Sequence, residues 1–242
     1  MANVMFDVIS KIIGQGLNEL NITLPLNSEA ALSAYYDFLI ERSKVMNLTA
    51  ITDPEEVAKL HFLDSIALLG AVSLENERVI DVGSGAGFPG VVLKLARPNI
   101  DLTLLDATGK KVAFLSELCD TLKIEANCIH ARAEELSHKD DIRETFDVSV
   151  SRAVAELRML CELCLPLVKV GGLMVAMKSI NSDEEIEGAK GAMGKLGAKL
   201  ENVYDYKIPE TDVFHRAVLI RKTDSTPNEY PRRFARIQNF PL

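Results

Sequence analysis

The chain has 242 residues, 48% of them hydrophobic, which allows one large domain with a sizeable core and argues against wholesale disorder. Its net charge of −8 argues, taken alone, against a nucleic-acid partner, and no run of about 18–20 apolar residues is present to span a membrane. The first ten residues lack the basic and small-residue pattern of a signal peptide, so a cytoplasmic location is expected.

The first 76 residues are predicted to be helical. Asn27-Ser28 starts one helix, and residues 47–50 break the helical pattern. Asp53-Pro54-Glu55-Glu56 starts the next, with an N-cap carboxylate, a proline at the first helical position and acids facing the positive end of the helix dipole. We predict a helical extension over residues 1–76, an α/β domain over 77–223 and a basic tail over 224–242.

From Arg78 onward, short β-rich runs alternate with amphipathic stretches, which predicts a doubly wound α/β fold, a parallel sheet with helices on both faces. The predicted strands are residues 79–82, 102–105, 126–130, 147–150 and 173–177, and the predicted helices are 87–95, 110–122, 155–167 and 183–196. Two extended runs, 198–206 and 213–221, predict an antiparallel hairpin that closes the sheet edge. Residues from Arg232 onward show no periodic pattern.

The four cysteines predict neither disulfides nor a metal centre. Disulfides are not expected without an export signal. Cys161 and Cys164 form a C-x-x-C pair, but no second Cys or His pair follows at zinc spacing. We interpret them as small buried thiols of a helix and expect no metal site.

A glycine-rich turn follows the first predicted strand, and a strand–turn–helix unit of this kind is typical of nucleotide-type sites. Gly85, Gly87 and Gly90 satisfy the dinucleotide fingerprint G-x-G-x-x-G, which leaves an NAD(P)-dependent oxidoreductase open. Gly83, Gly85 and Gly87 instead give G-x-G-x-G, with Asp81 at the mouth of the loop. A carboxylate there suits the ammonium and sulfonium of S-adenosylmethionine, and a seven-stranded sheet with a late hairpin favours this second class.

Polar side chains recur at the predicted carboxyl ends of successive strands, the edge where open α/β sheets bind ligands. They are Asp81, Asp106, His130 with Arg132 and Glu134, Ser151 with Arg152, and Lys178. Asp106 can accept hydrogen bonds from ribose hydroxyls. The loop Arg132-Ala133-Glu134 is the candidate for adenine recognition, whereas His61, His138 and His215 show no ligand spacing and are assigned no chemistry.

At these residues the sequence resembles the bacterial small-subunit ribosomal RNA guanine-N7 methyltransferases, also called the glucose-inhibited division protein B family. The resemblance covers nearly the whole chain and is carried by residues 47–51, 61–65, 81–90, 105–106, 110–111, 114–115, 132–135, 151–155, 230–233 and 241–242. It implies a class I, Rossmann-like S-adenosylmethionine-dependent methyltransferase with an N-terminal helical extension. The implied substrate is a guanine in the decoding-region loop of 16S rRNA, naked or in the small ribosomal subunit.

The resemblance also implies the site. The resemblance implies cofactor contacts at Gly83, Phe88, Ala133, Glu134 and Arg152. The residue pattern adds Asp81 and Gly85 at the glycine turn and Asp106 at the end of the next strand. Guanine N7 carries an unshared pair and no proton, so direct displacement needs alignment rather than a general base. Arg152 and Lys178 are hypothesised to hold the base edge or an RNA phosphate.

The basic tail offers a hypothesis for the RNA contact. Residues 207–242 carry seven basic and four acidic residues, a net charge of +3, against −11 for the rest of the chain. The tail is either a solubilising terminus or a phosphate-binding patch. We expect Arg232, Arg233 and Arg236 to contact rRNA phosphates. A non-catalytic nucleotide-binding module stays open beside the two enzyme classes, and the sequence does not define an oligomeric state.

Overall fold

The computed structural model of the chain describes the backbone of residues 2–242 and the side chains from residue 7 onward. Met1, where the predicted helical extension begins, lies outside the described residues. The N-terminal region is helical: α1 spans Ala2–Leu20 and α2 spans Ser28–Ser43. A continuous helical segment follows, composed of α3 (Pro54–Val57), a π-helical turn η1 (Ala58–Leu63), α4 (Asp64–Ala67) and the 3₁₀ turn η2 (Leu68–Gly70).

The start of this segment confirms the predicted helix cap. Asp53 Oδ1 accepts hydrogen bonds from the backbone N–H groups of Glu55 and Glu56, at 3.0 and 3.1 Å. Two of the unpaired N–H groups at the helix start are thereby satisfied. The π-helical turn was not predicted, because its one extra residue leaves the apolar spacing of the sequence nearly unchanged.

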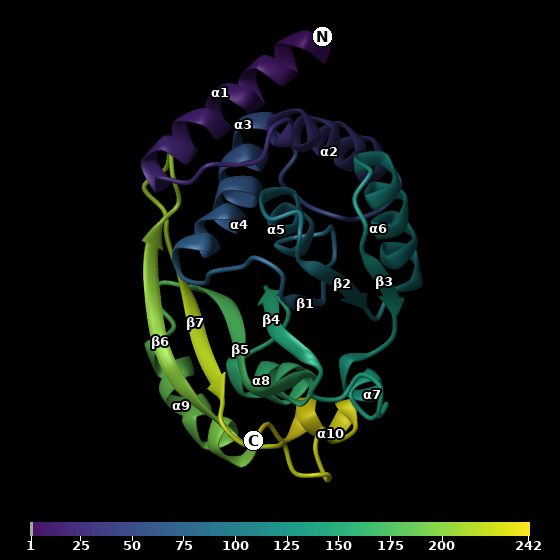
Figure 1. The fold of residues 1–242 in the computed structure, drawn as a ribbon, viewed down its shortest axis with the longest axis vertical. Coiled ribbons are helices and arrows are strands. Elements are labelled where there is room, and N and C mark those ends of the chain that lie inside the picture. Colours follow the sequence, from purple (N-terminus) through teal and green to yellow (C-terminus); the bar gives the residue numbers. More distant parts are fainter. Residues whose placement is uncertain (1) are drawn as a thin grey trace.

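The rest of the described chain is built around one seven-stranded sheet, whose strands lie in the order β3-β2-β1-β4-β5-β7-β6 (Figure 1). The strands are β1 (Arg78–Val82), β2 (Asp101–Asp106), β3 (Asn127–His130), β4 (Phe146–Arg152), β5 (Val168–Ser179), β6 (Ala198–Lys207) and β7 (Phe214–Lys222). The first five are parallel, and β7 runs antiparallel between β5 and β6. The predicted doubly wound sheet with a late antiparallel hairpin is confirmed.

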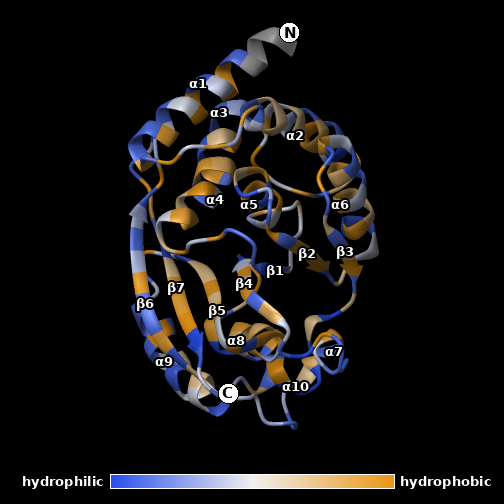
Figure 2. Ribbon diagram, in the orientation of Figure 1, coloured by the Kyte–Doolittle hydropathy of each residue, from blue (hydrophilic) through white to orange (hydrophobic). Residues whose placement is uncertain are grey.

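Helices cover both faces of the sheet, and the apolar strands lie between them (Figure 2). One hydrophobic cluster joins the N-terminal helices and α5 (Gly90–Ala96) and α6 (Gly109–Leu122) to one face. The other joins α7 (Ala133–Leu136), α8 (Leu157–Cys164), the 3₁₀ turn η3 (Leu165–Leu167), α9 (Asp183–Lys195) and α10 (Phe234–Asn239) to the opposite face. Cys161 and Cys164 are buried in this second cluster, as expected.

The structure differs from one sequence prediction and contains one helix that was not predicted. The helix after the glycine turn begins at Gly90 rather than at residue 87, because residues 83–89 are used by the loop itself. The region after Arg232 contains a helix, α10, whose six residues are too few to show a helical period. The division into regions 1–76, 77–223 and 224–242 stays a prediction.

The described residues contain neither a membrane-spanning helix nor a cluster of metal-binding side chains. No helix within residues 2–242 is both long and apolar enough to cross a membrane. The same part of the chain holds no group of three or more His, Cys, Asp or Glu side chains arranged to bind a metal ion.

Candidate active site

The glycine turn between β1 and α5 is held from both sides. The backbone N–H groups of Gly83 and Ser84 donate to the carbonyl of Leu105 at the end of β2, at 2.8 and 3.0 Å. Gly83 has φ +76°, and a Cβ there would overlap Cγ2 of Val154. On the other side, the Tyr35 hydroxyl of α2 donates to the carbonyl of Ala86 at 2.5 Å. A side chain at Gly83 would therefore be strained and would also displace its neighbour.

Asp81 lies beneath this turn, not at its mouth as predicted. Its side chain is fully buried, and Oδ2 accepts a hydrogen bond from the Gly90 N–H at 2.9 Å. The first free N–H of α5 needs an acceptor, which explains why the carboxylate turns inward. Oδ1 has no hydrogen-bond partner among the described residues. Burial raises the pKa of this carboxyl to about 7, although the Gly90 N–H acts in the opposite direction.

Asp106 organises the other side of the turn. Its Oδ2 accepts from the Gly85 N–H at 3.0 Å, and its Oδ1 accepts from the Thr108 N–H at 2.8 Å. The carboxylate is 7% exposed and faces the cleft described next. Since a carboxylate offers about four lone-pair sites, two acceptor positions remain for a ligand.

A cleft of about 480 Å³ opens at the carboxyl ends of β1 and β2. It is lined by Val82, Gly83, Leu105, Asp106, Ala107, Lys111, Ala131, Arg132, Ala133, Glu134, Ala153, Val154, Ala155, Met159, Leu163, Phe234 and Gln238. Four of the predicted cofactor residues, Gly83, Asp106, Ala133 and Glu134, thus come together. Burial raises the pKa of Glu134. The lining does not include Asp81, Gly85, Phe88, Arg152 or Lys178.

Arg152 and Phe88 meet outside this cleft. The Arg152 guanidinium lies over the Phe88 ring, 5.0 Å from its centroid. Its Nη1 donates to Asp64 Oδ2 at 3.1 Å and to the Leu60 carbonyl at 3.2 Å. Phe88 also stacks on Tyr35, with 5.1 Å between ring centroids. The two predicted residues therefore connect the glycine turn to the N-terminal helices.

Asp64 is the centre of a polar cluster that the sequence analysis missed. Its side chain is fully buried, and its Oδ1 accepts from the Tyr206 hydroxyl at 2.9 Å and lies 2.9 Å from His215 Nδ1. We call Asp64, Arg152, Tyr206 and His215 the Asp64 cluster. Its members come from α4, β4, β6 and β7, so no local spacing in the sequence could have indicated it.

His61, also assigned no chemistry from the sequence, borders this cluster. Its Nδ1 lies 3.3 Å from Arg152 Nη2, and its Nε2 lies 2.9 Å from the Thr49 hydroxyl. Burial and the neighbouring Arg152 charge lower the pKa of His61 to about 4. The imidazole is therefore neutral at neutral pH.

Lys178 is directed toward the start of α8. Its Nζ donates to the carbonyl of Ala155 at 2.7 Å and pairs with Glu185 Oε1 at 2.5 Å. The same Glu185 oxygen accepts from the Leu157 N–H at 2.6 Å. These contacts fix the segment between β4 and α8, which forms one wall of the cleft.

The three arginines of the tail differ in their surroundings. Arg232 pairs with Glu162, whose side chain is fully buried, through Nη2–Oε2 at 2.7 Å and Nε–Oε1 at 2.8 Å. The Arg232 guanidinium also donates to the Phe240 carbonyl at 3.0 Å. Arg233 and Arg236 are exposed. Arg232 thus anchors the tail, whereas the other two present their charges to solvent.

A Rossmann-like parallel sheet with a late hairpin, and a cleft at its glycine turn, define the class I methyltransferase fold. Among solved structures, the chain resembles a methyltransferase from Pyrococcus furiosus, with a TM-score of 0.53, 13% identity, and coverage of 80% of this chain and 98% of that one. It also resembles M. jannaschii TYW2 in complex with AdoMet, with a TM-score of 0.51, 17% identity, and coverage of 66% and 76%.

The model of the GidB family, rRNA small subunit methyltransferase G, matches residues 28–214. The chain belongs to this family. It is 44% identical over 237 residues to ribosomal RNA small subunit methyltransferase G of Pelotomaculum thermopropionicum, covering 97% of this chain and 99% of the relative. With that of Lachnoclostridium phytofermentans it shares 42% identity, covering 94% and 95%. The resemblance seen in the sequence is confirmed, and the oxidoreductase alternative is not favoured.

Proposed function

We propose that the chain transfers a methyl group from S-adenosylmethionine to N7 of a guanine in 16S rRNA. The observation that carries this proposal is the cleft where Gly83 and Asp106 meet, in a chain of the rRNA small subunit methyltransferase G family. The proposed target is the decoding-region loop of 16S rRNA. The substrate that carries this loop is either naked rRNA or the small ribosomal subunit.

The residues of the cleft fit this cofactor. Gly83 lines the cleft and has no side chain, so a ligand can approach its backbone closely. Asp106 keeps two acceptor positions for ribose hydroxyls, and Ala133 and Glu134 supply a turn for the adenine. The buried Oδ1 of Asp81 has no hydrogen-bond partner among the described residues and is our candidate acceptor for the cofactor's ammonium, although Asp81 does not line the cleft. When bound, S-adenosylmethionine supplies an electrophilic methyl group on a sulfonium.

In this proposal the chain's own residues orient the guanine and the cofactor, and none of them transfers a proton. Guanine N7 needs no base to attack a methyl group, so alignment supplies the catalysis. Arg152 is held by Asp64 and Phe88 and is our candidate for orienting the base. Lys178 fixes the β4–α8 segment that forms one wall of the cleft, and we propose that it acts on the substrate through this segment. Arg233 and Arg236 are the phosphate contacts of the tail, and Arg232 supports the segment that carries them.

The test is methyl transfer from labelled S-adenosylmethionine to 16S rRNA and to small subunits from cells lacking this gene, followed by mass mapping of the modified nucleotide. The expected product is one N7-methylguanine. Labelled cofactor that binds without transfer would support the non-catalytic module, and tighter binding of NAD(H) would support the oxidoreductase. Asp106→Asn, which weakens the ribose acceptor, should raise the Kd for the cofactor without changing the site of methylation.

A further inference from the structure

The C-terminal helix forms one wall of the cleft. Phe234 and Gln238 of α10 line it, together with residues of the glycine turn more than a hundred positions earlier in the chain. The Arg132 guanidinium lies 5.0 Å from the centroid of the Phe234 ring. Figure 1 shows α10 beside α7 and α8. A segment read from the sequence as a tail is therefore part of the site.

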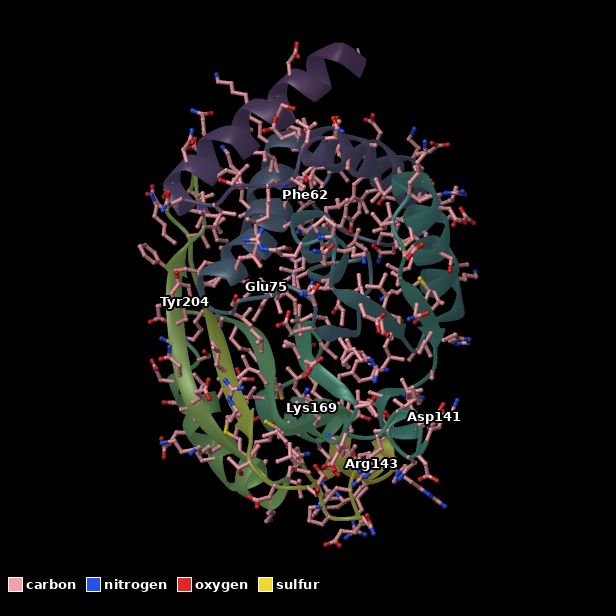
Figure 3. The ribbon with its side chains drawn as sticks, in the orientation of Figure 1. Phe62, Glu75, Asp141, Arg143, Lys169 and Tyr204 are labelled. Carbon is pink, nitrogen blue, oxygen red and sulfur yellow. The ribbon has the colours of Figure 1, made fainter. Side chains whose placement is uncertain are left out.

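This helix is anchored in the protein. Ile237 is fully buried in the cluster with α8 and α9. Arg143 donates hydrogen bonds to the carbonyls of Thr226, at 2.8 Å, and Tyr230, at 2.9 Å, and Figure 3 places its side chain in the C-terminal region. The pair between Arg232 and buried Glu162 fixes the residue two positions before α10 begins. Phe234 and Gln238 consequently have defined positions in the cleft wall.

The cleft is lined by both polar and apolar groups. Asp106 is a carboxylate acceptor, which suits the hydroxyls of a ribose. The Met159 and Leu163 side chains and the Phe234 ring are apolar and suit a flat heteroaromatic ring. Gln238 adds an exposed amide with both donor and acceptor atoms, the pair of groups that matches an adenine edge.

We propose that Phe234 and Gln238 bind the adenine of S-adenosylmethionine: the Phe234 ring packs on the base, and the Gln238 amide reads its hydrogen-bonding edge. This inference rests on the proposed cofactor. It assigns the C-terminal helix a part in cofactor recognition, beside the proposed RNA contacts of Arg236 on the same helix and of Arg233 directly before it.

The test is calorimetric titration of the full chain with S-adenosylhomocysteine and with S-inosylhomocysteine, in which an oxygen replaces the adenine amine. Phe234→Ala should raise the Kd for both ligands by about 5- to 100-fold, the effect of losing one base–aromatic stacking contact. Phe234→Tyr should retain wild-type affinity. On the N6–N7 edge the Gln238 amide meets one donor and one acceptor in adenine but two acceptors, O6 and N7, in hypoxanthine. Gln238→Ala should therefore weaken the adenosyl ligand more than the inosyl ligand and so reduce the wild-type preference for the adenosyl ligand.

Asn239→Ala is the matched control, because Asn239 is exposed on the same helix but does not line the cleft. It should bind both ligands as the wild type does. Wild-type affinity and preference in Phe234→Ala and Gln238→Ala would overturn this proposal while leaving the proposed function intact. A wild-type chain that binds neither S-adenosylhomocysteine nor S-adenosylmethionine would overturn the proposed function itself. If Phe234→Ala does not fold, the ligand preference of Gln238→Ala decides.

Discussion

The Arg152 guanidinium and the Asp64 carboxylate form an ion pair, Nη1 to Oδ2 at 3.1 Å, that joins the end of β4 to the N-terminal helices. The Asp64 side chain is 1% exposed, and that of Arg152 is 17% exposed. A pair so little exposed is weakly screened by solvent, and removing one partner leaves the other without compensation. The N-terminal region and the sheet are thus joined by charge as well as by apolar contact.

Asp64→Asn should lower the free energy of unfolding by about 3–5 kcal/mol, because it removes the charge that compensates Arg152 and weakens the contacts with Tyr206 and His215 to those of a neutral amide oxygen. Urea unfolding at pH 7.5 measures this change. Glu55→Gln is the control, since its pair with Lys59 is exposed and its loss should change stability by less than about 0.5 kcal/mol. Equal losses in the two variants would refute a special role for Asp64.

Arg152→Gln should reduce methyl transfer at saturating cofactor by about tenfold or more, because the neutral side chain cannot replace the guanidinium held over Phe88. Single-turnover assays with 16S rRNA give the rate, and calorimetry gives the cofactor Kd. A variant with wild-type activity and wild-type cofactor affinity would end the assignment of Arg152 to the site.

Acid should destabilise the protein through His61. Burial and Arg152 lower the pKa of His61 from 6.5 to about 4, so the unfolded chain binds a proton in this range that the folded chain does not. The free energy of unfolding should fall as the pH drops from about 6.5 to 4, by up to about 3 kcal/mol for this group. His61→Gln should lose this part of the dependence in urea unfolding between pH 4.5 and 7.5, whereas His130→Gln, at an exposed position, should keep the wild-type profile.

Gly83→Ala should weaken cofactor binding, because φ +76° strains an alanine by about 1–2 kcal/mol and the new Cβ must displace the Val154 side chain. Val154→Ala alone should bind the cofactor within about threefold of wild type. The double variant removes the overlap but keeps the backbone strain, so it should recover only part of the affinity. Full binding by Gly83→Ala in calorimetry would show that the turn is not needed in this conformation.

Truncation after Thr223 would change the stability of the protein as well as its RNA binding, because it removes the ion pair between Arg232 and buried Glu162. Arg232→Gln should lower the free energy of unfolding by about 3–5 kcal/mol, and adding Glu162→Gln should restore part of the loss. The double variant Arg233→Ala, Arg236→Ala should keep wild-type stability but reduce the salt slope of rRNA binding by about 1–2. An unchanged salt slope would remove both arginines from the RNA interface.

Local patterns were enough to predict the sheet and the glycine turn. Strand–helix alternation and the glycine spacing are visible in consecutive residues. Asp106 lines the cleft because it is the last residue of β2, at the edge where the sequence pattern predicted a ligand. The direction of Asp81 was not predictable in this way, since it depends on the unpaired N–H of Gly90. The Asp64 cluster joins residues up to 151 positions apart, and α10 depends on a pair 70 positions apart. Such contacts arise from folding and leave no periodic signal in the sequence.

The placement of β7 between β5 and β6 has a consequence during synthesis. β6 is made before β7, so the sheet cannot be completed until β7, Phe214–Lys222, has been translated. Until then β5 presents an open, apolar edge of unpaired backbone groups, and edges of this kind recruit strands from other chains. Protection of this edge from aggregation during translation therefore depends on a strand that is made after all the other strands of the sheet.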